Sequence, residues 1–278
     1  YAAEATVDEM NTIINLAGKQ RMLTQKMVKE VLLILSGVHA SENRYHLEST
    51  ITLFDRTLKG LQQGDSGLGL VDVDHPDIAT QLQQVSLLWG SFQNKLYAAL
   101  DGNLPKQTVA RVADESLILL ESVNKAVEIY MTLSGKNKNN TAQMTALHTI
   151  NLSGRQRMLT QKMSKEWLLI VNDIDPEDNR KRLKATMALF EQTLDGLREG
   201  DARQGLPGTK ERSIRSQLES VQGLWLQYKP LLEAGGAGTV TQADLERVYQ
   251  INLDLLKAMN VAVKMYEFVA GKNDSSGF

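Results

Sequence analysis

The sequence predicts an all-α fold of two tandem antiparallel four-helix bundles, related by an internal pseudo-two-fold axis. The first observation is that the second half of the chain repeats the first half at a fixed displacement. The second is that apolar residues recur every three or four positions, while no useful stretch alternates with the period of two that strands require. We therefore expect one bundle over residues 1–136 and a second over residues 137–278.

The repeat is centred on one long motif. Residues 14–27 read INLAGKQRMLTQKM and residues 150–163 read INLSGRQRMLTQKM, a displacement of 136 positions. Matches continue at the same displacement through the rest of each half, as at Asn124 and Asn260. The two halves therefore need no net insertion relative to each other, and each is expected to form the same structural unit.

The first predicted helix covers residues 6–35, because apolar side chains recur along it at helical spacing and Gly37 lies just beyond its end. A second helix is expected over residues 41–63. It should stop at Gly64, since glycine suits the left-handed conformation that closes a helix.

The third helix is expected over residues 76–100 and the fourth over residues 106–133, before a Ser-Gly-Lys sequence. In the second half, Pro176 suits the first turn of a helix and Gly200 suits a helix end. The polar residues 136–140 are expected to link the two bundles.

Composition excludes several classes of protein. A net charge of −2 and an isoelectric point near 6.2 argue against a nucleic-acid partner. The chain has no cysteine, which excludes disulfides, thiolate nucleophiles and cysteine zinc sites. Neither a phosphate-binding glycine loop nor a nucleophile elbow is present, and no histidine pair has the spacing of a di-iron or zinc site. We therefore expect a protein that is not an enzyme and holds no metal or other cofactor.

The two ends of the chain indicate a compartment. The opening residues, Tyr-Ala-Ala-Glu-Ala, resemble the surroundings of a signal-peptidase cut, so we expect a periplasmic protein secreted through a removed signal peptide. The last helix is expected to stop at Gly271 and continue as polar coil, which favours a freestanding protein over a fragment of a membrane receptor. No apolar run approaches the roughly 20 residues that a membrane-spanning helix needs.

One stripe of the first helix carries the candidate site. At about 3.6 residues per turn, Gly18, Arg21 and Gln25 share this stripe. Gly18 has no side chain, so a ligand or another helix can approach the backbone there. The same stripe in the second half carries Gly154, Arg157 and Gln161. Arginines on such a stripe are also common at interfaces, where they pair with carboxylates and stack over apolar neighbours.

Other polar residues of the motif have weaker claims to a site. Four of them are expected either to orient the arginines or to make ordinary interhelical hydrogen bonds: Asn15, Asn151, Gln25 and Gln161. Two lysines are spaced to pair with carboxylates one turn later, as Lys26 with Glu30 and Lys162 with Glu166. Lys19 and Arg155 point away from the arginine stripe, so we expect them in solvent.

The repeated motif resembles the signature of the PilJ-type sensor domain, which occurs in bacterial chemotaxis transducers and is akin to the nitrate-sensing domains NarX and NarQ. The resemblance implies a helical bundle that binds nitrate or nitrite between two copies of its first helix, with one arginine from each copy on the anion. In this chain those arginines are Arg21 and Arg157. The tandem halves are then similar to an internally fused dimer of a domain that usually acts as a homodimer.

Nitrate suits a site between two arginines. Two guanidinium charges about 8 Å apart repel by roughly 2 kcal/mol at an effective dielectric constant near 20, and a small anion removes this repulsion. Nitrate is flat, and its oxygen pairs match the two-pronged donor face of a guanidinium. We therefore expect a sensor that binds nitrate or nitrite and relays binding to a membrane-bound sensor kinase or chemoreceptor.

Three alternatives stay open at this point. The first is that the chain is an interaction module that docks on a membrane sensor or a pilus component and binds no small molecule. A helical-bundle enzyme with a metal site is a weaker alternative. Finally, two chains can form a homodimer in which Arg21 meets Arg21 of the second chain, which would give separate sites for the two motifs.

Overall fold

The computed structural model describes residues 5–101, 104–136, 141–235 and 240–275. The first four residues, most of the predicted linker and the last three residues lie outside these ranges. Within the described ranges every regular element is a helix, so the all-α prediction is confirmed. Two isolated bridges, one in the loop after each unit's second helix, join Asp65 to Leu70 and Asp201 to Leu206.

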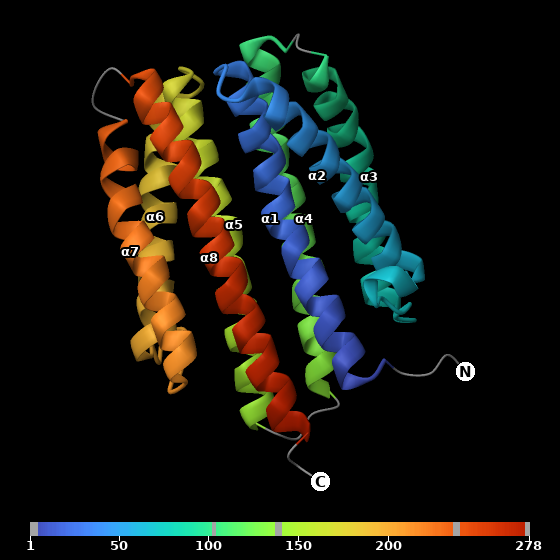
Figure 1. Cartoon of the computed structure of the whole chain (residues 1–278). Helices are drawn as coiled ribbons and strands as arrows, with labels where there is room; N and C mark the ends of the chain where they lie inside the picture. The colour runs from blue at the N-terminus through green and yellow to red at the C-terminus, as the bar shows by residue number, and fades with distance from the viewer. Residues whose placement is uncertain (1–4, 102–103, 137–140, 236–239, 276–278) are drawn as a thin grey trace. The chain divides into compact units, whose positions relative to one another are not determined.

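The chain divides into two compact units, residues 1–139 and 140–278. The first unit contains α1 (Val7–Leu35), α2 (Ala40–Gln63), the short 3-10 helix η1 (Ser66–Leu68), α3 (Pro76–Leu100) and α4 (Lys106–Lys136). The second contains α5 (Thr141–Val171), α6 (Pro176–Glu199), α7 (Arg212–Ala234) and α8 (Gln242–Ser275). Figure 1 shows the successive helices of each unit running in alternating directions.

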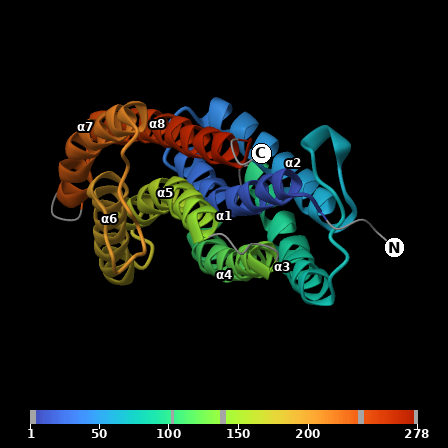
Figure 2. The same cartoon turned by 90° about the horizontal axis from the view of Figure 1, so that it is seen from below.

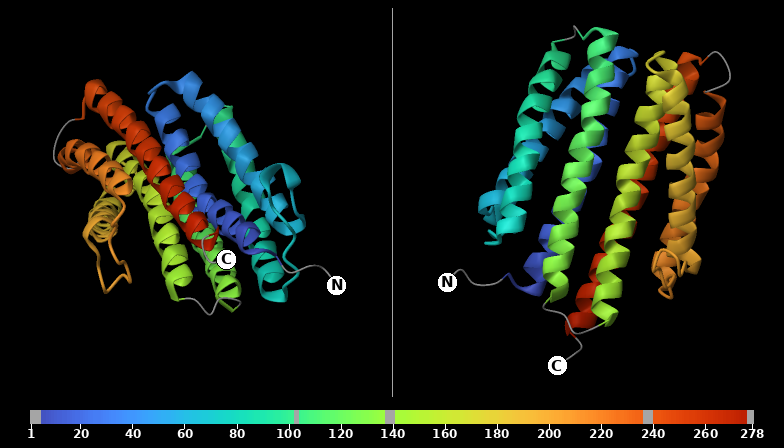
Figure 3. Two further views of the ribbon diagram at one scale, coloured as in Figure 1. Left: turned by 60° about the horizontal axis from the view of Figure 1, so that its bottom comes forward. Right: turned by 180° about the vertical axis from the view of Figure 1, so that it is seen from behind.

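Each unit is a four-helix bundle in which the first helix packs against the second and the fourth. In the first unit α1 packs against α2 and α4, and α3 packs against α4 and α2. In the second unit α5 packs against α6 and α8, and α7 packs against α8 and α6. Figures 2 and 3 show α1 beside α4 and α5 beside α8 from several sides. The motif helix is therefore covered by the second and the fourth helix of its own unit.

Local sequence explains where several helices begin and end. Thr6 caps α1, because its hydroxyl accepts from the Glu9 amide while the Glu9 carboxylate accepts from the Thr6 amide. Pro176 occupies the first turn of α6 as predicted. Gly64 and Gly200 close α2 and α6 as predicted, with positive φ values of 81° and 98°, although their ψ values of 152° and 146° lie outside the left-handed helical region.

The predicted ends of the two fourth helices are wrong. Helix α4 continues through Gly135 to Lys136, and α8 continues through Gly271 to Ser275. Neither glycine has a positive φ, so neither forms the left-handed cap that ends a helix. A glycine inside a helix costs only about 1 kcal/mol relative to alanine, which packing along the bundle can offset. None of the described helices combines enough length and apolar character to cross a membrane.

A tryptophan on the third helix anchors each core. Trp89 packs on Phe54 with ring centroids 4.3 Å apart, and Trp225 packs on Phe190 at 4.9 Å. Both indoles are buried, and each Nε1 donates to a carboxylate on the second helix at 3.2 Å. Because these contacts recur at corresponding positions, the two units repeat each other in packing as well as in sequence.

Candidate functional site

Arg21 is buried inside the first unit and is held by two neutral oxygens. Its side chain is 3% exposed, and its Nη1 donates to Asn124 Oδ1 on α4 at 3.1 Å. Its Nε lies 3.4 Å from the carbonyl oxygen of Gly18, one turn earlier on α1. Both of these acceptors are neutral oxygens, and they help to fix the orientation of the guanidinium.

Gly18 makes room for this arginine. A Cβ atom at position 18 would lie 3.2 Å from Arg21 Nη2, which is closer than most side-chain contacts. The sequence predicts an open approach to the backbone at this glycine. In the structure the group that uses the approach is the guanidinium of Arg21, which folds back over the preceding turn.

Asn124 is itself oriented by a carboxylate. Its Nδ2 donates to Oε1 of the exposed Glu128 at 2.7 Å, which turns Oδ1 of the same amide towards Arg21. Sequence analysis missed Asn124 as a site residue. The only signal for it was its recurrence as Asn260, and recurrence alone does not place an asparagine beside an arginine.

Arg157 occupies the corresponding place in the second unit with different neighbours. It is 6% exposed, and its Nη1 donates to Asn260 Oδ1 at 3.5 Å. Burial lowers the pKa of its guanidinium, and the nearby Glu267 acts in the opposite direction. Burial raises the pKa of Glu267, against the effect of Arg157 and Lys264. Each arginine therefore has an asparagine partner on the fourth helix of its own unit, but the charged groups around the two arginines differ.

The remaining predicted site residues lie along the same helices. Gln25 Nε2 donates to the Ser116 carbonyl oxygen at 3.2 Å, and Gln161 Nε2 donates to Asn252 Oδ1 at 3.2 Å. Both glutamine amides thus reach the fourth helix of their unit. Asn15 and Asn151 are half-buried, and Gly154 is buried. Arg21 belongs to the first unit and Arg157 to the second, so their predicted meeting on one anion stays a prediction.

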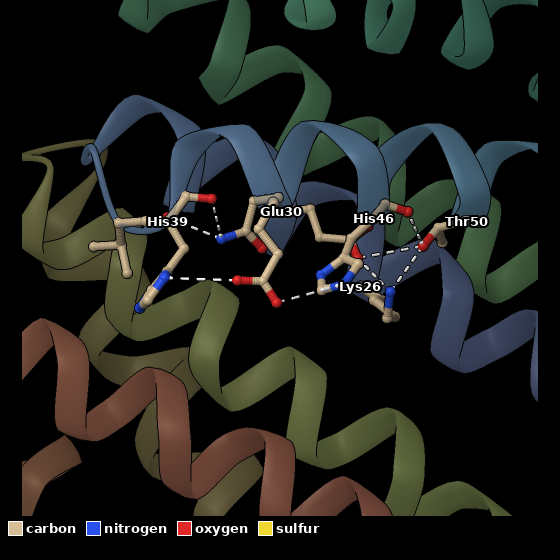
Figure 4. A network of polar contacts seen from close by, with 8 residues as sticks. Lys26, Glu30, His39, His46 and Thr50 are labelled. Atoms are coloured by element: carbon tan, nitrogen blue, oxygen red, sulfur yellow. Dashed lines mark hydrogen bonds and ion pairs between the residues drawn. The ribbon is translucent and has the colours of Figure 1, made fainter.

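The two lysine–glutamate pairs predicted from the motif are confirmed. Lys26 Nζ bonds the Glu30 carboxylate and also donates to Thr50 Oγ1 at 2.8 Å, as Figure 4 shows. The second unit repeats this arrangement with Lys162, Glu166 and Thr186. Glu30 is 1% exposed and the Lys26 side chain is 21% exposed, so the carboxylate lies in the bundle interior and the ammonium lies nearer the surface.

A further lysine of the motif helix has an unusual environment. Lys29 is buried, and burial together with the charge of Lys26 lowers its pKa to about 7, although Glu30 acts in the opposite direction. Its counterpart Lys165 is buried as well. Neither lysine was predicted to have a role in the site. Within the described ranges, no cluster of three or more histidine, aspartate or glutamate side chains is arranged to hold a metal ion.

Three comparisons relate these units to known proteins. The family model described as "Type IV pili methyl-accepting chemotaxis transducer N-term", PilJ, matches residues 5–114 and 140–252. The methyl-accepting chemotaxis protein McpN of Pseudomonas aeruginosa is 34% identical over 118 residues, which are 42% of this chain and 21% of McpN. The chain therefore matches about a fifth of the length of that relative.

A solved structure gives a similar result. The ligand-binding domain of the P. aeruginosa nitrate receptor McpN is 32% identical, with a TM-score of 0.40, and the match covers 44% of this chain and 96% of that domain. Each match to McpN is thus about as long as one of the two units described above.

Proposed function

The chain belongs to the PilJ family of N-terminal domains of type IV pili methyl-accepting chemotaxis transducers, and from this premise we propose that it is a sensor that binds nitrate. The family match includes both copies of the repeated motif, so the proposal applies to both halves. Arg21 and Arg157 are the proposed anion-binding residues, with Gly18 and Gly154 beside them. In the arrangement that the duplication predicts, both arginines bind the same anion.

The observation that carries the proposal is the repeated setting of the motif arginine. Each unit buries this arginine on its first helix and holds it through an asparagine oxygen of the fourth helix. A guanidinium fixed in this way has a defined orientation before a ligand arrives. Such preorganisation reduces the ordering cost of binding, because the receptor side chain does not have to be immobilised.

Nitrate is the proposed ligand for chemical reasons as well as by similarity. A planar anion accepts two parallel hydrogen bonds from one guanidinium, which spherical chloride cannot do. A single negative charge costs less to bury than the double charge of sulfate. McpN is described as a nitrate receptor, and the segment of this chain that is similar to it is about as long as one unit. Nitrite is the closest competitor, since it offers one oxygen pair.

The proposal includes a place and a role for the protein. We propose that the chain acts in the periplasm and passes the binding signal to a membrane-bound chemoreceptor or sensor kinase. Binding and release of an anion suffice for such a role, so no bond in the ligand needs to break. Arginine and amide groups supply the recognition, and neither a metal nor an organic cofactor takes part.

Calorimetric titration with nitrate is expected to give saturable binding in the micromolar range. Nitrite should bind more weakly, because it has a single oxygen pair and leaves no second pair for the other guanidinium. Sulfate and chloride should give no saturation at concentrations about 100-fold higher, for the reasons of charge and shape given above. The measurement compares the four sodium salts at equal ionic strength, since exposed charges respond to salt.

The same titration separates this proposal from the interaction module. A ligand that binds only the folded protein raises its melting temperature by mass action, so nitrate should stabilise the chain against heat. If nitrate gives neither heat of binding nor thermal stabilisation, the sensor proposal is wrong, and a module that binds only a protein partner becomes the better account.

A further inference from the structure

The two halves differ in charge next to their arginines, although the arginines and asparagines are the same. The position of Glu128 in the first unit is Lys264 in the second, and the position of Met131 is Glu267. The first unit therefore places an exposed carboxylate beyond Asn124, where it orients that amide. The second unit places its carboxylate one turn further along the fourth helix, in a partly buried position.

The direction of the helices brings this second carboxylate towards Arg157. Helices α5 and α8 run antiparallel, since Arg157 contacts Asn260 while Gln161, one turn later on α5, contacts Asn252. Side chains on a helix lean towards its N-terminus, as Arg21 does over Gly18. For Arg157 that direction leads along α8 from Asn260 towards Glu267. Seven residues are about two helical turns, so Asn260 and Glu267 share one face of α8.

The carboxylate of Glu267 is short of hydrogen-bond partners. Its Oε1 has no solvent access and no hydrogen-bond partner in the described part of the chain. The charged groups that act on this carboxyl are Arg157 on α5 and Lys264 on α8. His148, a further titratable group on α5, is turned to the Gln204 carbonyl oxygen at 2.7 Å. Arg157 is thus the group through which the charge of Glu267 can affect a ligand.

We propose that Glu267 tunes the affinity of the anion site, because its ionised carboxylate competes with the anion for Arg157. The inference rests on the proposed function and adds a regulatory residue to the same site. The first half has Met131 at the corresponding position, so the two halves contribute unequally: the contribution of Arg157 depends on the protonation state of Glu267, and the first half has no carboxylate at that position.

The sign of the pH effect follows from this competition. At low pH Glu267 is neutral and no longer competes for Arg157, so the anion binds most tightly. As the pH rises through the pKa of Glu267, which burial holds above its ordinary value, the carboxylate ionises and affinity falls. Binding of the anion at intermediate pH therefore takes up a proton.

Calorimetric nitrate titrations of the full chain between pH 4.5 and 8, a range of about 3.5 units that includes an elevated carboxyl pKa, test this inference. Wild-type affinity should fall by about tenfold across the range, which corresponds to a coupling of one pKa unit. Glu267→Met copies the first half and should bind about tenfold more tightly at pH 8, with a flat profile. Glu267→Gln keeps the size and removes the charge, so it should behave in the same way. Met131→Gln is the matched control and should leave the profile unchanged.

Several outcomes would overturn the inference. If both Glu267 variants keep the wild-type affinity and pH profile, Glu267 does not act on the site. If Glu267→Met tightens binding but Glu267→Gln does not, the effect comes from packing and not from charge. These results leave the sensor proposal standing, because nitrate still binds. Absence of nitrate binding by the wild-type chain at every pH would instead overturn both.

Discussion

Replacing Arg21 with alanine is expected to abolish nitrate binding, and replacing Arg157 is expected to do the same. Each guanidinium donates charge-assisted hydrogen bonds to the anion, and one such bond contributes about 1.5–3 kcal/mol. Loss of two bonds corresponds to a weakening of roughly 100-fold or more. Calorimetric titration measures this loss, and circular dichroism checks that Arg21→Ala and Arg157→Ala remain folded.

Two further variants make this prediction specific. Arg21→Lys keeps the positive charge but loses the planar pair of donors, so it should bind nitrate more weakly than wild type and more tightly than Arg21→Ala. Arg155→Ala removes an exposed arginine two positions from Arg157 and should leave affinity unchanged. Wild-type affinity in either arginine-to-alanine variant would place the anion elsewhere.

Binding capacity distinguishes the two ways in which the arginines can act. If both bind the same anion, each single variant loses all of the binding. If the motifs form separate sites, as in a homodimer that pairs each motif with its own copy, each variant loses half of the capacity and the rest keeps its affinity. Sedimentation of the wild-type chain shows whether it is a monomer or a homodimer, and therefore whether sites between two chains can form.

Glu30→Ala is expected to destabilise the first unit by about 3–5 kcal/mol, the usual cost of removing one partner from a buried ion pair. Glu30 is 1% exposed, and Lys26 and the buried Lys29 lie beside it on α1. Without the carboxylate, the Lys26 ammonium loses its favourable charge interaction in a partly buried place, and Lys29 loses the neighbouring negative charge that raises its pKa. Urea unfolding followed by circular dichroism measures the change, and Glu166→Ala should have a similar effect in the second unit.

The chain offers a matched control for this pair. Lys125 and Glu121 form a pair of the same spacing on α4, but both side chains are more than half exposed. Glu121→Ala should therefore cost much less stability than Glu30→Ala, since solvent screens an exposed pair. Equal losses of stability in Glu30→Ala and Glu121→Ala would show that burial of the Lys26–Glu30 pair does not determine how much the pair stabilises the protein. A double variant, Lys26→Met with Glu30→Leu, should recover much of the stability lost in Glu30→Ala.

Much of the fold could be predicted from the sequence because its signals are local or repeated. Helical spacing, Pro176 in a first turn and Gly64 at a helix end each depend on a few neighbouring residues. The predicted ends of α4 and α8 were wrong because Gly135 and Gly271 remain inside their helices, unlike Gly64, which ends α2 with a positive φ. The sequence does not distinguish such a glycine from one inside a helix, such as Gly271.

The site could be predicted only in part because its partners are distant in the chain. The motif identified Arg21 and Arg157, whereas Asn124 lies 103 positions from Arg21 and required the packing of α1 on α4. The same limit applies where two contacting positions both differ between the halves. Ser164 and Tyr228 make a buried hydrogen bond of 2.5 Å where the first half has two apolar side chains, and only their contact explains why both positions changed.

The central claim is that the duplicated motif arginines of one chain bind one small planar anion. A crystal structure of the chain with saturating nitrate tests it most directly. The account predicts one nitrate whose oxygens lie within hydrogen-bond distance, about 3 Å, of the guanidinium groups of both Arg21 and Arg157. Nitrate bound away from both arginines, or found on only one of them, would contradict it.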